Sequence, residues 1–145
     1  MKKLFLSLVC LVFMSTAAFA DRDVVITVEQ LPPVSQQLIK KHFADTQVVF
    51  ATMEAGFDKS YEVLFANGCK VEFDAKGEWT DVDCMHNSEV PAGIVPPNIL
   101  AFVTKTHPGI KITDIDKDRR GYDVKLNNQA ELVFDLTGNF LRYDD

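Results

Sequence analysis

YEVLFANGCKVEFDAKGEW, residues 61–79, is the stretch that decides the fold, because its pattern returns as YDVKLNNQAELVFDLTGNF at residues 122–140. Both stretches set alternating apolar residues before a Phe-Asp-x-x-Gly turn and an aromatic residue. Upstream, Leu-Pro-Pro at residues 31–33 returns as Val-Pro-Pro at residues 95–97. A pattern repeated in this way predicts two copies of one small structural unit.

The first of these stretches predicts an antiparallel hairpin. Apolar residues alternate on both sides of Ala66-Asn67-Gly68, a three-residue loop whose glycine can adopt the left-handed conformation. The resulting register places Tyr61 opposite Phe73 and Val63 opposite Val71. One face of the hairpin is then apolar throughout.

Each copy opens with a proline pair, and the second proline suits the first turn of a helix. We predict short amphipathic helices at residues 34–43 and 98–106, and first strands at residues 48–54 and 110–116. The predicted fold is α+β, with two tandem repeats that each pack a short helix on an antiparallel sheet of three to four strands. The predicted boundaries are residues 21–84 for the first repeat, 85–94 for a linker and 95–145 for the second repeat.

Residues 1–20 have the three parts of a secretory signal peptide. Two lysines precede an apolar run from Leu4 to Phe13, and a small-x-small triplet ends at Ala20. We predict cleavage between Ala20 and Asp21 and a periplasmic or secreted protein. The apolar run is shorter than the roughly 20 residues of a membrane span, so no membrane insertion is expected after its removal.

The chain is acidic, with 15 Lys and Arg against 21 Asp and Glu, and the leader removes two lysines without removing an acid. Nucleic-acid binding rests on clustered Lys and Arg, and the sequence contains no such cluster, so a nucleic-acid partner is not expected. An acidic surface serves colloidal solubility or binds a basic protein surface, and both interpretations remain open.

The order of these motifs resembles a known family. The sequence passes from Leu-Pro-Pro to Tyr-x-Val, Asn-Gly and Phe-Asp-x-x-Gly-x-Trp, then through a second Pro-Pro helix to Gly-Tyr-x-Val and Phe-Asp-x-x-Gly-x-Phe. This order resembles the β-lactamase-inhibitor-like, PepSY-like periplasmic proteins of Gram-negative bacteria. The resemblance implies a tandem αβ architecture like that of the secreted β-lactamase inhibitor protein, whose two sheets offer a concave face to a partner. It implies no catalytic residues.

Cys69 and Cys84 are the strongest chemical feature, because neighbouring cysteines of an exported protein usually pair. Trp79 and Val82 can share the core face only if one extra residue lies between them, as in a β-bulge. That bulge brings Cys84 opposite Cys69, so we predict a disulfide between them. The alternative is two separate reduced thiols; a redox-active pair would need the Cys-x-x-Cys spacing.

No catalytic or metal site is predicted. The acidic series Asp114, Asp116 and Asp118 lacks the glycine and the terminal glutamate of a loop-type calcium motif, so a solvated strand face is favoured. Asp74 and Asp135 each precede a turn and are expected to accept hydrogen bonds from its backbone. No serine lies in a nucleophile elbow. The three histidines, His42, His86 and His107, have no second ligand nearby in sequence, and two of them, His42 and His107, suit helix C-termini.

We therefore expect a non-catalytic binding module without a cofactor, whose partner is another exported protein that it inhibits or regulates. The alternative is a small-ligand or cation-binding periplasmic protein. Trp79 and Phe140 are either interface anchors or matched core residues, and their equivalence in the repeat favours the core. The expected binding face lies on the side of the strands away from the helices and comprises Glu62, Leu64, Glu72, Asp123, Lys125 and Glu131.

Overall fold

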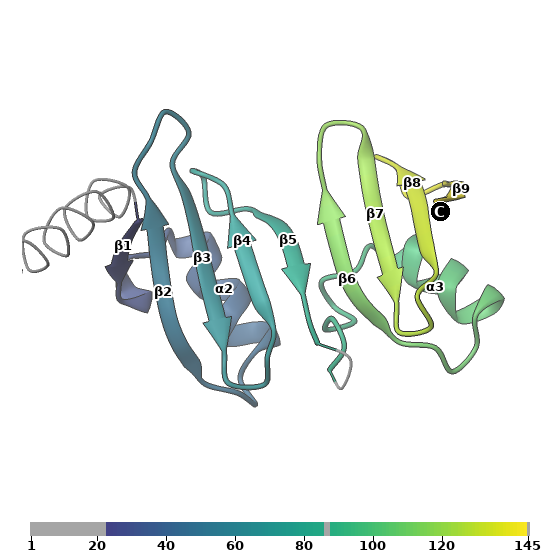
Figure 1. Ribbon diagram of the computed structural model, residues 1–145, viewed down its shortest axis with the longest axis horizontal. Coiled ribbons are helices and arrows are strands. Elements are labelled where there is room, and N and C mark those ends of the chain that lie inside the picture. Colours follow the sequence, from purple (N-terminus) through teal and green to yellow (C-terminus); the bar gives the residue numbers. More distant parts are fainter. Residues whose placement is uncertain (1–22, 86–87, 145) are drawn as a thin grey trace, which may run out of the picture.

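The computed structural model describes residues 23–85 and 88–144, and within them the chain forms one α+β structure. Nine strands make a single antiparallel sheet in which each strand pairs with the next along the chain. Helices α2 (Pro33–His42) and α3 (Pro97–Thr106) lie on one side of this sheet, behind it in the view of Figure 1. The predicted signal peptide, His86 and Asp145 lie outside the described residues.

The strands fall into two groups, separated by α3. Strand β1 comes before α2, and four strands follow each helix. We call residues 23–85 the first half and residues 88–144 the second half. The strands are β1 (Asp23–Ile26), β2 (Val48–Glu54), β3 (Ser60–Phe65), β4 (Lys70–Phe73) and β5 (Trp79–Asp83), then β6 (Ile112–Lys117), β7 (Gly121–Leu126), β8 (Glu131–Asp135) and β9 (Phe140–Asp144).

Both helices begin at the second proline of their pair, one residue before the predicted start. A proline at this position loses no helical hydrogen bond, because the first N–H groups of a helix have no partner within it. Each helix is short and is stabilised by packing its apolar stripe on the sheet. In the first half Phe43 stacks on Phe65 with ring centroids 4.2 Å apart. In the second half Phe102 stacks on Phe140 at 4.5 Å.

The predicted hairpin register is confirmed. Tyr61 pairs with Phe73 and Val63 with Val71, and all four side chains are buried. Gly68 has a φ of +92°, and its N–H donates to the carbonyl of Phe65 over 3.0 Å. Local alternation and turn chemistry were sufficient to fix this hairpin.

The prediction of two separate repeat sheets is wrong in one respect, because the sheet is continuous. Strand β5 pairs antiparallel with β6, so the two halves share one sheet. An exposed edge strand leaves its N–H and C=O groups unpaired, and joining two edges satisfies them. On the helix side of this junction Val82 faces Ile115, and both are fully buried. The predicted strand 110–116 is observed at Ile112–Lys117.

Two further features were not predicted. Strand β1 pairs with β2 and gives the first half a fifth strand, one more than expected. The linker assigned to residues 85–94 also contributes to the core, since Val90 and Ile94 are buried in it. The backbone of Val90 donates to the carbonyl of Ile112 over 2.9 Å, which ties this segment to the second half.

Among the residues that the structure describes, no helix is both long enough and apolar enough to cross a membrane.

Candidate binding face

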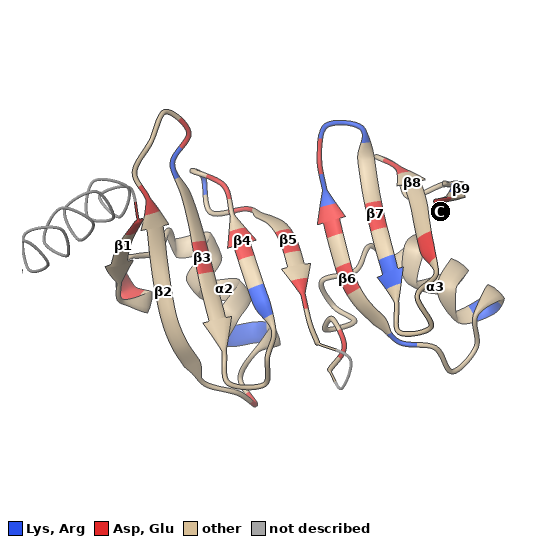
Figure 2. Cartoon of the chain, in the orientation of Figure 1, with Lys and Arg blue, Asp and Glu red and all other residues tan. Residues whose placement is uncertain are grey.

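The side of the sheet away from the helices carries a continuous row of acidic side chains. Strand pairing sets Glu62 directly opposite Glu72, and Glu72 opposite Asp81. Asp81 faces Asp116 across the junction of the two halves, and Asp116 faces Asp123. Each strand from β3 to β7 therefore contributes one carboxyl group to the same row. We call these five residues the carboxylate row; acidic segments on all five strands are visible in Figure 2.

A second row runs beside the first and alternates in charge and polarity. It passes from Leu64 through Lys70 and Asp83, and then through Asp114 and Lys125 to Glu131. Lys125 and Glu131 form an ion pair of 3.6 Å, with nearly half of each side chain exposed. Such an exposed pair contributes at most about 1 kcal/mol to stability. We call this the mixed row.

The structure places all six residues of the expected binding face on this side of the sheet. Three belong to the carboxylate row: Glu62, Glu72 and Asp123. Three belong to the mixed row: Leu64, Lys125 and Glu131. A role in binding stays a prediction.

Sequence reasoning missed the two residues that make the row continuous, Asp81 and Asp116. The sequence favoured a solvated strand face for Asp116, but its meeting with Asp81 depends on the pairing of β5 with β6, which the sequence did not predict. The available signal was the Asp-x-Asp alternation on both strands, which places Asp81 and Asp83 on one face of β5 and Asp114 and Asp116 on one face of β6.

Four carboxyl groups of the carboxylate row hold protons more tightly than free side chains do. Burial raises the pKa of Glu72, and the neighbouring Asp81 carboxyl raises it further. Burial likewise raises the pKa of Asp116 and of Asp123, with repulsion from nearby aspartates adding to both. For Asp81, burial and a hydrogen bond with Asp114 together raise the pKa to about 8. These carboxyl groups therefore resist being ionised all at once, and a positive charge placed beside them would stabilise their ionised forms.

Hollows on this face are shallow and lined largely by polar groups. One of about 240 Å³ lies over β6 to β9 and includes Asp114, Asp116 and Asp123. Another, of about 380 Å³, lies over β1 to β4 and includes Glu62 and Glu72. Small-molecule sites are usually enclosed clefts with mostly apolar walls. The hollows of this face are open and polar by comparison.

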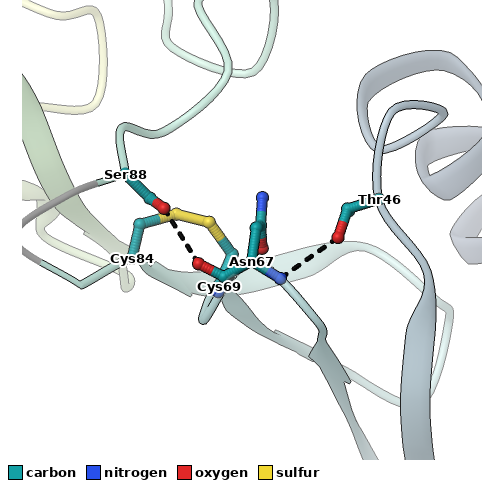
Figure 3. The surroundings of a disulfide bond; sticks show 5 residues. All are labelled: Thr46, Asn67, Cys69, Cys84 and Ser88. Atoms are coloured by element: carbon teal, nitrogen blue, oxygen red, sulfur yellow. Dashed lines mark hydrogen bonds between the residues drawn. A yellow bond between two sulfur atoms is a disulfide. The ribbon is translucent and has the colours of Figure 1, made fainter.

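The predicted disulfide between Cys69 and Cys84 is present (Figure 3), with Cα atoms 4.0 Å apart. The predicted bulge is also present: Glu72 faces Asp81 while Phe73 faces Trp79, which leaves Thr80 as the extra residue of β5. Beside the bridge, the Ser88 hydroxyl donates to the carbonyl of Asn67 over 2.9 Å. The bridge therefore fixes the end of β5 that leads to the second half.

The other side chains considered in the sequence have structural roles. Asp74 accepts hydrogen bonds from the N–H groups of Lys76 and Glu78, and Asp135 accepts from those of Thr137 and Asn139, as predicted. Trp79 and Phe140 pack against the core, which confirms the core interpretation.

The remaining polar candidates are also engaged locally. His42 ends α2 and His107 follows the last residue of α3; a ring nitrogen of His107 lies 3.0 Å from the Tyr143 hydroxyl. Asp118 accepts hydrogen bonds from the backbone N–H groups of Arg120 and Gly121. Within residues 23–85 and 88–144, no group of three or more His, Cys, Asp or Glu is placed to hold a metal ion.

Comparison with known proteins gives a family and several similar structures. A family model described as "Putative beta-lactamase-inhibitor-like, PepSY-like" matches residues 59–142. The chain is 48% identical to a "putative calcium-regulated periplasmic protein" from Bacteroides thetaiotaomicron, with a TM-score of 0.81 over 87% of this chain and 99% of that chain.

Two proteins from Bacteroides vulgatus ATCC 8482 are also similar. One is described as a "putative periplasmic protein" from the DUF2874 family, with 45% identity and a TM-score of 0.80 over 87% of this chain and 99% of that chain. The other is a "putative periplasmic protein of unknown function", with 36% identity and a TM-score of 0.78 over 85% of this chain and 99% of that chain. No curated protein matched the chain.

Proposed function

Because the chain belongs to the PepSY-like family, we propose that it is an exported, non-catalytic binding module that inhibits or regulates another exported protein. The side of the sheet away from the helices, which we call the open face, binds a basic surface of that partner. Residues 1–20 direct export and are removed between Ala20 and Asp21, and the mature protein acts in the periplasm. Similarity to proteins described as periplasmic supports this location.

The observation that carries this proposal is the carboxylate row. Like charges directly opposite one another destabilise a sheet, yet the chain sets five acidic side chains opposite one another in successive strands. A basic partner would neutralise them, and complementary charge speeds association and orients the complex. The breadth of the face, which spans both halves of the sheet, also suits a protein better than a small molecule.

The duplicated organisation is part of the proposal. We assign residues 21–84 and 95–145 to two copies of one unit, joined by residues 85–94. Matched features support it: Gly77 and Gly138 both have positive φ at equivalent turns, and Phe73 pairs with Trp79 as Phe134 pairs with Phe140. Superposition of the two segments should bring these glycines and aromatic residues together in space, and a failure to do so would contradict the duplication.

A second candidate function is binding of a small ligand or cation. The observation that favours it is the description of the similar Bacteroides thetaiotaomicron protein as calcium-regulated. Calorimetric titration of the mature protein with calcium chloride tests this candidate directly. Tight calcium binding with no protein partner would replace the first proposal with the second.

Capture of partners from native periplasm tests the main proposal. The bait is the mature protein, and the face variant neutralises three acids of the row: Glu62→Gln, Glu72→Gln and Asp123→Asn. The matched control neutralises three exposed acids outside the strands: Glu29→Gln, Asp45→Asn and Asp58→Asn. We expect one protein to be retained by the wild type and the control and lost by the face variant.

Direct binding of the purified partner then provides the decisive measurement. Its affinity should fall as sodium chloride rises, because exposed charges are screened by salt. A partner that binds both variants equally, or whose binding is indifferent to salt, would mean that the open face is not the interface.

A further inference from the structure

Strands β5 and β6 join the two halves of the sheet, and every facing pair on the open side of this junction consists of two aspartates. Asp81 faces Asp116, and Asp83 faces Asp114. Between them Val82 faces Ile115 on the helix side, where both are buried. Four carboxyl groups therefore meet where the halves are joined, and their mutual repulsion acts directly on the pairing of β5 with β6.

One atom of this group requires a hydrogen-bond donor. Asp114 Oδ1 is buried and has no hydrogen-bond partner among the described residues. A buried acceptor without a donor is costly, and two ionised carboxylates cannot hydrogen-bond because both only accept. The Asp81 carboxyl lies within hydrogen-bonding range of the Asp114 carboxyl. A proton on Asp81 would make it the missing donor.

The surrounding charges decide which carboxyl keeps the proton. Glu72 of β4, Asp116 of β6 and Asp83 of β5 surround Asp81, and all are acidic. Burial also raises the pKa of Asp114, but the hydrogen bond from Asp81 lowers it, and Lys125 of β7, which Asp114 faces, opposes the repulsion from Asp83 and Asp116. Asp83 faces Lys70 of β4. The asymmetry leaves the proton on Asp81 and the negative charge on Asp114.

We propose that Asp81 is a neutral carboxylic acid in the folded protein at pH 7 and donates its O–H to Asp114, so that one shared proton holds the two halves together and makes their junction sensitive to pH. This proposal concerns the protein alone and does not depend on the partner proposed above. It makes Asp81 the hydrogen-bond donor and Asp114 the ionised acceptor.

The sign of the pH effect follows from the proton count. Between the ordinary aspartate pKa of 3.8 and about 8, the folded state holds a proton on Asp81 that the unfolded state has lost. Stability therefore falls as pH rises through this window and levels off above it. Part of this loss of stability is the repulsion between the two carboxylates that remain in contact once the proton has left.

Carboxyl ¹³C NMR titration of the mature protein tests the proposal. We expect Asp81 to titrate with a midpoint near pH 8, and to shift clearly downward in Asp114→Asn, which removes the neighbouring charge. Asp83→Asn is the matched control, because it removes one charge from the same junction without removing the acceptor, and its effect on Asp81 should be smaller. An Asp81 midpoint below pH 7 would overturn the proposal, because the carboxyl group would then be mostly ionised at that pH.

Thermal unfolding of Asp81→Asn supplies a second readout. Asparagine keeps a donor at this position but cannot ionise. The melting temperature of the wild type should fall between pH 5 and pH 8 relative to that of the variant. If the melting temperatures of the two proteins change with pH in parallel, the shared proton is refuted. If Asp114→Asn does not fold, the NMR titration of the wild type alone tests the proposal.

Discussion

Loss of the Cys69–Cys84 bridge should destabilise the protein by about 3 kcal/mol, on the loop-entropy model. The bridge joins residues separated by 15 positions, and a closed loop of about 15 residues removes about that much conformational entropy from the unfolded chain. Both sulfur atoms belong to buried residues. Replacement of both cysteines by alanine therefore removes this entropic stabilisation and also leaves a small void in the core.

Thermal unfolding followed by circular dichroism measures the effect. With an unfolding entropy of roughly 2.1 cal/mol/K per residue, a domain of about 120 residues loses about 12 °C in melting temperature for 3 kcal/mol. The wild type should melt about that much lower in a reducing agent than without it, because reduction opens the loop but leaves both sulfur atoms in place. The double alanine variant should melt slightly lower again.

Two results would contradict this reasoning. A shift of less than about 3 °C on reduction would mean that the bridge does not restrict the unfolded chain as the loop model requires. A shift in the double alanine variant when the reducing agent is added would show that the agent acts elsewhere, because this variant has no bridge to break.

Two further predictions concern a turn and the carboxylate row. Gly138→Ala should lower the unfolding free energy by about 1 to 3 kcal/mol, because Gly138 has a φ of +85° and an added Cβ would collide with the Asn98 side chain. Gly56→Ala is the control, since a Cβ there meets nothing within 4 Å, and equal effects of the two substitutions would contradict the argument. In urea unfolding, Glu72→Gln should raise the unfolding free energy by about 0.5 kcal/mol at pH 8, and by less at pH 5, where the raised pKa of Glu72 keeps this side chain partly protonated. The control Glu78→Gln, at an exposed position, should show no such gain.

Features that depend on neighbouring residues could be predicted from the sequence. The hairpin of β3 and β4 follows from alternating apolar residues and one turn glycine, Gly68. The bulge in β5 follows from the need to place both Trp79 and Val82 on the core face, and the disulfide follows from the bulge. Each inference uses residues within one hairpin, where the register is set by the chain itself.

Features that depend on the meeting of distant segments could not be predicted. Asp81 and Asp116 lie far apart in the sequence, and their alignment requires that the last strand of the first half pair with the first strand of the second. The composition of the connecting segment argued against this, because its small and polar residues indicated a linker. Val90 and Ile94 are instead buried in the core, and the Val90 N–H donates to the carbonyl of Ile112 at the start of β6.

The two faces of the sheet carry different kinds of side chain. The helix side holds the core, including Val82 and Ile115 at the junction, so the open side can carry repulsive charges within the stability that this core supplies. Asp81 is the middle residue of the carboxylate row, and its proton at neutral pH removes one of the five charges. Rising pH through about 8 would restore that charge, weakening the fold while strengthening attraction for a basic partner. Opposite pH trends for stability and for partner affinity would therefore tie the shared proton to the proposed binding face, whereas parallel trends would separate them.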